Sequence, residues 1–344
     1  MYDVVTIGTA TRDVFLRSTF FKVLRDPKHL RRLGFQTGEA QCLALGGKLE
    51  VGAPVLTLGG GALNAAVTFA RRGLRAAALV KIGKDPNGEA VLRDLKQEKI
   101  SPLIRYDQKQ MTAYSVVLLS PGGERTILHH RGASEDLTTS EANFKNVRTK
   151  WIYVNPGRIP YKVIKKIIFG WSERGALVAM NPSAHYLKFG VKKLAPLLKK
   201  VSVLILNREE AAALTNVPYR EERRIFKRLD ELAPGVAVMT EGKRGVMVAD
   251  GKFIYHAGTF KEKFVADRTG AGDAFGSAFV ASLIKSRANP ARGVTAGQIR
   301  EAIRAASANA TSVVEAIGAE QGILKSSGFA APRWRNFKID TRRA

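Results

Sequence analysis

The most informative stretch of the 344-residue chain, residues 267–275, reads Asp-Arg-Thr-Gly-Ala-Gly-Asp-Ala-Phe. Two glycines one residue apart let backbone N–H groups turn toward a ligand, and the apolar spacing that follows predicts a helix. Because a helix N-terminus carries unpaired N–H groups and a partial positive charge, residues 270–272 could hold a phosphate. Asp273, in the first helical turn, could then take a proton from a hydroxyl that attacks this phosphate. An ordinary glycine turn before a helix is the alternative interpretation.

Composition predicts a globular protein with a substantial core, since 45% of the residues are hydrophobic. The single cysteine, Cys42, excludes an internal disulfide framework, and its apolar neighbours favour a packed residue over a nucleophile. No apolar run approaches about 18 residues, and the chain opens with a strand-like segment instead of a basic leader. We therefore expect a soluble, cytoplasmic protein without a membrane partner.

The net charge of +26, from 56 basic and 30 acidic residues, at first suggests nucleic acid or an anionic membrane. The basic residues are, however, scattered at helical spacing beside apolar residues, over 22–32, 162–166, 188–200, 220–228 and 333–343. This pattern predicts solvated helix faces and no specific nucleic-acid partner. The positive field would still concentrate an anionic substrate such as a nucleotide triphosphate.

Strand-like runs alternate with helical patterns over most of the chain, which predicts an α/β fold. We expect a doubly wound, mainly parallel sheet with helices on both faces. The predicted strands are residues 4–7, 76–82, 151–154, 176–180, 203–206 and 236–239, followed by a hairpin of 245–249 and 252–256. The predicted helices are residues 62–72, 89–98, 162–173, 187–199, 209–214, 221–232, the helix that begins near residue 271, and 295–316.

Two segments interrupt this alternation. Residues 13–59 combine a basic amphipathic stretch with a strand-like run at 43–51, and residues 112–129 resemble a hairpin. We interpret about 14–58 and 110–132 as one small β-rich lid inserted in a single α/β domain of residues 1–330. A surface excursion with no catalytic role is the alternative. Residues 331–344 are predicted to be a loosely held basic tail.

Two further segments could bind sugar hydroxyls. Residues 59–64 read Gly-Gly-Gly-Ala-Leu-Asn and open a helix, so a ligand could approach the backbone closely. Asn64 offers both a donor and an acceptor. Asp13 follows the first strand, where open α/β sheets bind ligands, and its carboxylate could accept bonds from two vicinal hydroxyls. A tight turn without a ligand is the alternative for residues 59–61.

Two more segments suit a nucleotide. Asn207 and Glu210 directly follow a predicted strand, three residues apart, so they could hold a hydrated Mg²⁺. A helix cap is the alternative for this pair. Residues 240–245 read Thr-Glu-Gly-Lys-Arg-Gly, so the backbone could approach a nucleotide here, or the segment could be a plain hairpin turn.

Several other sites are excluded. Residues 46–49, Gly-Gly-Lys-Leu, lack the spacing and the hydroxyl of a P-loop, so a P-loop nucleotide site is excluded. The first strand ends without Gly-x-Gly-x-x-Gly, which disfavours a Rossmann dinucleotide site. His129 and His130 are adjacent on a predicted strand and point to opposite faces, so they cannot form one zinc site alone.

Together these motifs resemble the ribokinase-like (PfkB) carbohydrate kinase family over about residues 2–322. The two glycine-rich segments match its two signatures, Asn207 and Glu210 match its Asn-x-x-Glu motif, and Thr240 and Gly242 match its Thr-x-Gly motif. The resemblance implies a ribokinase-like domain with a lid. It also implies a homodimer through the lid, whose sheet edges need covering.

The resemblance implies a role for each matching residue. Asp273 would be the catalytic base, and the anion hole would be formed by Gly270, Ala271 and Gly272. The sugar hydroxyls would be bound by Asp13, Gly60, Gly61 and Asn64. The nucleotide site would be lined by Asn207, Thr240, Gly242 and Asn309. Mg²⁺ would be organised through water by Asn207 and Glu210, and a monovalent cation such as K⁺ would lie near Asp267.

The chain departs from the family pattern in the sugar and phosphate segments. Arg268 replaces the small hydroxyl residue usual after Asp267, and Gly61 stands where ribokinases have Lys, so ribose is not assured as the substrate. The interval 13–59 is longer than the family suggests. Arg125 and Arg131, in or beside the lid hairpin, could contact an acidic or phosphorylated substrate, or form surface salt bridges.

The expected activity is ATP- and Mg²⁺-dependent phosphorylation of a hydroxymethyl group on a sugar or sugar-like molecule. A nucleoside kinase of the same family is the alternative, with a lid phenylalanine (Phe15, Phe20, Phe21 or Phe35) stacking on the base. A polyanion-binding protein on a kinase scaffold, suggested by the charge, is the alternative from another class.

Overall fold

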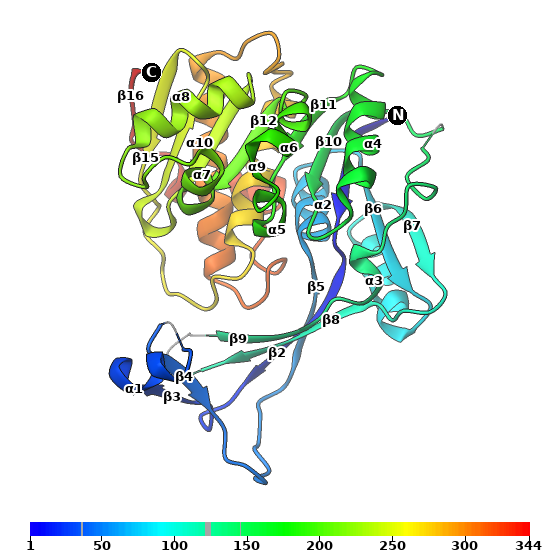
Figure 1. Cartoon of the computed structure of the whole chain (residues 1–344), viewed down its shortest axis with the longest axis vertical. Helices are drawn as coiled ribbons and strands as arrows, with labels where there is room; N and C mark the ends of the chain where they lie inside the picture. Colours follow the sequence, from blue (N-terminus) through cyan, green and yellow to red (C-terminus); the bar gives the residue numbers. More distant parts are fainter. Residues whose placement is uncertain (36, 121–124, 145) are drawn as a thin grey trace.

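The computed structural model describes residues 1–35, 37–120, 125–144 and 146–344, and within them the centre is a ten-stranded sheet (Figure 1). Its strands lie in the order β16 (Ile339–Arg343), β15 (Phe253–Ala257), β14 (Val246–Ala249), β13 (Val236–Thr240), β12 (Val203–Asn207), β11 (Leu177–Met180), β10 (Thr149–Asn155), β1 (Tyr2–Gly8), β6 (Ala76–Gly83) and β7 (Ser101–Asp107). The strands from β13 to β7 run parallel, whereas β14, β15 and β16 are antiparallel. The inner strands are apolar and buried, as parallel strands covered on both faces require.

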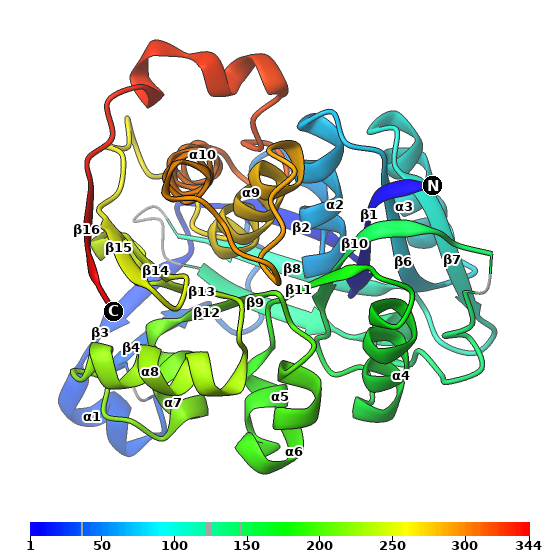
Figure 2. The same cartoon turned by 90° about the horizontal axis from the view of Figure 1, so that it is seen from above.

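Helices cover both faces of this sheet, as Figure 2 shows. One face packs against α2 (Gly61–Arg71), α3 (Pro86–Gln97), α9 (Ala271–Lys285) and α10 (Ala296–Val314). The other packs against α4 (Tyr161–Ser172), α5 (Ala184–Leu187), α6 (Gly190–Leu198), α7 (Arg208–Thr215) and α8 (Glu222–Leu232). The prediction of a doubly wound α/β fold is therefore confirmed. The predicted helix 187–199 is divided between α5 and α6, with Gly190 in the left-handed region at the break.

A second, four-stranded sheet extends from one edge of the body (Figure 1). Its order is β5 (Val55–Gly59), β2 (Thr11–Arg17), β8 (Ala113–Leu119) and β9 (Arg125–His130). Its far end carries α1 (Pro27–Arg32) and a hairpin of β3 (Lys22–Arg25) and β4 (Glu39–Cys42). A small β-rich lid is confirmed, but the predicted strand at 43–51 is wrong. The sequence did not reveal β2 as a strand, because the polar Asp13 interrupts its apolar pattern. The prediction that Cys42 is packed is also wrong, since its side chain is exposed. Most of the predicted lid turn, 121–124, lies outside the described residues.

The C-terminal segment is not a loose tail. β16 pairs antiparallel with β15 and completes the edge of the main sheet. Trp334 is buried and packs edge-on against Phe260, with ring centroids 4.9 Å apart. Aromatic burial and strand pairing thus hold residues that looked like a solvated basic run in the sequence.

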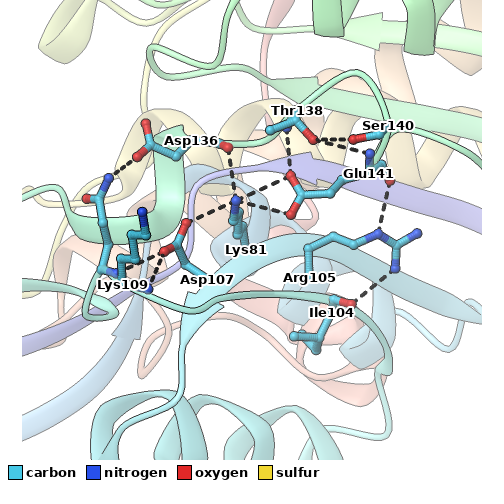
Figure 3. A network of polar contacts seen from close by, with 10 residues as sticks. Lys81, Ile104, Arg105, Asp107, Lys109, Asp136, Thr138, Ser140 and Glu141 are labelled. Atoms are coloured by element: carbon cyan, nitrogen blue, oxygen red, sulfur yellow. Dashed lines mark hydrogen bonds and ion pairs between the residues drawn. The ribbon is translucent and has the colours of Figure 1, made fainter.

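A buried cation joins β6 to its neighbours (Figure 3). The ammonium of Lys81 lies 3.0 Å from Asp107 and 3.1 Å from Glu141, and it donates to the Asp136 carbonyl at 3.1 Å. Burial lowers the pKa of Lys81, but the bonds to Asp107 and Glu141 outweigh this effect and raise it. The charge is tolerated because it is fully paired.

Among the described residues, no helix is long and apolar enough to cross a membrane.

Candidate active site

The candidate site lies where parallel strands end and the helices α2 and α9 begin. Gly8 of β1 is in register with Asn155 of β10, and Asn207 of β12 with Thr240 of β13, so these carboxyl ends share one edge of the sheet. Ligands of open α/β sheets bind at this edge. Gly60, which precedes α2, and Gly270, which precedes α9, have φ angles of 87° and 78° and allow both helices to start there.

Asp273 is held by one amide on each carboxylate oxygen. Asn64 of α2 donates from Nδ2 to Oδ2 at 3.0 Å, and Asn155 at the end of β10 donates from Nδ2 to Oδ1 at 3.0 Å. Burial raises the pKa of Asp273, and the two amide bonds offset part of this rise by stabilising the ionised form. The carboxylate is thus oriented at the first turn of α9, as a general base requires.

Asn155 is a site residue that sequence reasoning missed. Its amide also lies 3.5 Å from Asn181 Oδ1, and Asn181 donates to the Ile205 carbonyl at 2.9 Å. Asn155 is the last residue of β10, Asn181 directly follows β11, and each precedes a proline. An Asn-Pro pair directly after two such strands is the signal that could have revealed them.

The sugar side presents buried acceptors without partners. Asp13 is 8% exposed, and its Oδ1 has no hydrogen-bond partner; Asn64 Oδ1 likewise has none. Burial raises the pKa of Asp13 to about 6, although a bond from Ser115 opposes this shift. Unpaired buried acceptors are costly unless a ligand supplies donors. They therefore suit the hydroxyl groups of a substrate.

The glycines beside these residues make room for site side chains. A Cβ at Gly59 would lie 2.0 Å from Asp13 Oδ2, and a Cβ at Gly61 would lie 2.0 Å from Asn155 Nδ2. A Cβ at Gly270 would lie 2.4 Å from that of Ala319. Glycine is therefore required at these three positions because other atoms of the same chain lie against the backbone, and not only because a ligand could approach it.

Two of the predicted nucleotide-side residues, Thr240 and Gly242, line a pocket of about 140 Å³ beside α9, whereas Asn207 and Asn309 do not. Thr240, Gly242, Ala271 and Gly272 all contribute to its wall. Arg268 lines the same pocket, with its guanidinium 3.9 Å from Glu262. The arginine that departs from the family pattern thus lies on the side where phosphate oxygens would need a cation.

Asn309, which was expected to line the nucleotide site, lies in the core instead. It is 0% exposed; its amide donates to the Ala274 carbonyl at 3.0 Å, and its Oδ1 accepts from Leu324 N at 2.9 Å. Its polar groups are therefore used in holding α9 and α10 together. Its neighbours Ala310 and Thr311 line the pocket instead.

Asn207 and Glu210 form a reciprocal helix cap. Asn207 Oδ1 accepts from the Glu210 N–H at 2.8 Å, and Glu210 Oε2 accepts from the Asn207 N–H at 2.9 Å. Burial raises the pKa of Glu210. The next residue, Arg208, donates to Glu241 at 2.9 Å. The cap therefore starts α7, and the bond from Arg208 to Glu241 joins α7 to the loop that follows β13.

Two other predicted site residues, Asp267 and Arg131, are not among those that line the pocket. Asp267 Oδ1 accepts from the Thr269 N–H at 3.0 Å and from its hydroxyl at 2.8 Å, whereas the buried Asp267 Oδ2 has no partner. Arg131 pairs with Glu135 at 2.9 Å, which is the salt-bridge alternative. In the part of the chain that the structure describes, no cluster of three or more His, Cys, Asp or Glu could hold a metal.

Comparison with known proteins identifies the family of the chain. The family model described as pfkB family carbohydrate kinase matches residues 37–325. An uncharacterized sugar kinase of Archaeoglobus fulgidus is 25% identical over 267 residues, which cover 75% of this chain and 98% of that protein.

Solved structures share the fold across nearly the whole chain. A ribokinase of Arabidopsis thaliana, complexed with ribose and ATP, superposes with a TM-score of 0.73 at 18% identity and covers 97% of this chain and 99% of its own. A nucleoside kinase of Methanocaldococcus jannaschii gives a TM-score of 0.71 at 17% identity, with coverage of 96% and 98%.

Proposed function

The chain belongs to the pfkB family of carbohydrate kinases and is a phosphotransferase that acts on a sugar hydroxyl, and we propose that it transfers the ATP γ-phosphoryl group to a hydroxymethyl group. The observation that carries this proposal is the Asp273 carboxylate. Amides of α2 and β10 hold its two oxygens at the N-terminus of α9. One of these amides belongs to Asn64, whose Oδ1 has no partner, and the residue before Asp273, Gly272, lines the pocket.

In the proposed reaction, the substrate oxygen attacks the γ-phosphorus, its proton passes to Asp273, and ADP leaves with the bond to the γ-phosphoryl group broken. Asn64 and Asn155 orient the carboxylate toward the hydroxyl. Backbone N–H groups of Gly270, Ala271 and Gly272, with the dipole of α9, would stabilise charge on the transferring group. Positioning and electrostatics would supply most of the rate.

The residues present fit the expected ions. The capping contacts leave Glu210 Oε1 able to accept from metal-bound water, and Mg²⁺ retains several waters when it is held with substrate phosphates. When bound, Mg²⁺ would supply neutralisation of phosphate charge. The unpaired, buried Asp267 Oδ2 fits a monovalent cation such as K⁺.

For the acceptor we propose a sugar or sugar-like molecule with vicinal hydroxyls, bound by Asp13 and Asn64. The nucleoside alternative rests on the exposed Phe20 and Phe35 of the lid, because Phe15 and Phe21 are buried in the structure and not available for stacking. A panel of ribose, fructose, 2-keto-3-deoxygluconate, hexose phosphates and nucleosides, read as ADP production, tests the proposal. No ADP production above background with any of them would contradict it.

The pH dependence of sugar binding tests the role of Asp13. Because the pKa of Asp13 is about 6, the acceptor is lost as the pH falls through this value. We expect the Kd of the sugar, measured by calorimetric titration, to rise about tenfold per pH unit below about pH 6. Asp13→Asn should weaken sugar binding and remove this pH dependence from the Kd; a pH dependence of the Kd that persists in the variant would contradict the assignment.

The same shift predicts an effect on stability. Burial disfavours the ionised Asp13 in the folded protein. The ligand-free protein therefore loses stability as the pH rises from 3.8, the ordinary pKa of an aspartate, to about 6, the pKa of Asp13 in the folded protein. At pH 8, Asp13→Asn is therefore expected to raise Tm in the absence of sugar.

We further propose a homodimer through the lid. Its far end exposes a group of large apolar side chains: Leu24, Leu33, Phe35, Leu43 and Leu45. Such a patch on a protein surface marks an interaction site, and a second lid would cover it. Leu24→Glu with Leu45→Glu should convert a dimer into a monomer in light scattering after size exclusion. Phe253→Glu, at an exposed apolar side chain of the body, should not; a monomeric parent protein would refute the dimer.

A further inference from the structure

The helices α4 and α6 carry a concentration of positive charge that the kinase chemistry does not use. Residues 159–201 contain eight lysines and one arginine but only one acidic residue, Glu173. All eight lysines are exposed. We name the following six the lysine face: Lys162, Lys165, Lys166, Lys193, Lys199 and Lys200.

These cations lack the counter-charges found elsewhere on the molecule. Among the described residues, no carboxylate forms an ion pair with any member of the lysine face. On α8, which covers the same side of the sheet, Arg224 pairs with Glu221 and Arg228 with Glu231. Two of the four basic residues of α8 thus have a carboxylate partner, whereas among the described residues no member of the lysine face has one.

Aromatic rings draw the lysines of the two helices together. Lys165 of α4 and Lys200, just past α6, both lie over the ring of Phe169, at 5.5 and 5.7 Å from its centroid. Lys193 of α6 lies over Phe189 at 4.2 Å and also over the ring of Tyr161, the first residue of α4, at 5.3 Å. Cation–π contacts fix the positions of the ammonium groups without neutralising them. The result is a pre-organised positive surface.

The chemistry of this surface favours one class of partner. No large apolar side chain between residues 149 and 200 is exposed, so the surface has nothing to insert into a lipid bilayer. Lysine ammonium groups act as point charges that suit phosphate oxygens. We propose that the lysine face binds the sugar-phosphate backbone of nucleic acid, without reading its sequence. This surface is separate from the pocket at the strand ends.

The experiment compares two variants of the full-length protein with equal loss of charge. The first changes Lys162, Lys165, Lys193 and Lys200 to Gln; the second changes Arg223, Arg224, Lys227 and Arg228 of α8 to Gln. Binding of a fluorescent single-stranded RNA is measured between about 50 and 200 mM salt. The first variant should bind at least about tenfold more weakly, and its salt slope should fall by up to about 3, because each phosphate contact on a single strand contributes about 0.7. The second should bind like the parent protein.

Other outcomes would overturn the proposal. Equal weakening in both variants would assign the binding to overall charge, and tighter binding to anionic lipid vesicles than to RNA would assign the face to membranes. Absence of RNA binding by the parent protein at about 50 mM salt would also refute it. Since neither variant touches the catalytic site, unchanged ADP production verifies folding. If the first variant does not fold, chemical acetylation of the parent protein with and without RNA provides the test, since only protection concentrated on the lysine face supports the proposal.

Discussion

Replacement of Asp273 with Asn is expected to lower kcat by about 10³-fold while ATP binding stays nearly unchanged. The amide has almost the shape of the carboxylate but cannot take the proton of the attacking hydroxyl. It also cannot accept from both Asn64 and Asn155 at once, so one of these bonds is lost. ADP production under saturating substrates measures kcat, and calorimetric titration with ATP measures the nucleotide affinity.

A second aspartate provides the control for this substitution. Asp230 of α8 is half-buried, and burial raises its pKa to about 6, yet it lies outside the site. Asp230→Asn should therefore leave kcat unchanged. Turnover in Asp273→Asn close to that of the parent protein would refute the role of Asp273 as the base.

Gly61→Ala is expected to lower kcat by about 10²-fold, although the alanine would touch no reacting atom. Its Cβ would lie 2.0 Å from Asn155 Nδ2, so Asn155 would have to leave the position from which it holds Asp273. A displacement of about 1 Å in a catalytic group can cost a factor of this size. Steady-state kinetics would separate kcat from the KM of the sugar.

Gly170→Ala is the matched control, because Gly170 is also a helical glycine and an added Cβ would meet no atom within 4 Å outside its own helix backbone. This variant should leave kcat unchanged and slightly raise Tm, since alanine favours the helix. A Gly61→Ala protein with unchanged kcat but a raised sugar KM would contradict the positioning role. It would instead favour direct sugar binding at this turn.

The glycine-rich turns and the alternation of strands and helices were predictable because their signals are local. Residues 59–64 and 267–273 contain closely spaced glycines ahead of helices that the structure confirms, and the parallel strands predicted from apolar runs are almost entirely buried. The lid was predicted from its interruption of this alternation. Its strand positions were less accurate, because β2 contains a buried Asp13 whose partners are distant in sequence.

The chain by itself determined the fold class, the family and the carboxylate on which the proposed chemistry depends, since these follow from residue type and short-range spacing. Only the tertiary structure decided which groups surround that carboxylate. Asn155 reaches Asp273 across 118 residues of sequence, and Asn309 is used inside the core. The C-terminal strand is ordered by its pairing with β15. Burial and hydrogen bonding between distant segments depend on how the whole sheet assembles, and no local pattern carries that information.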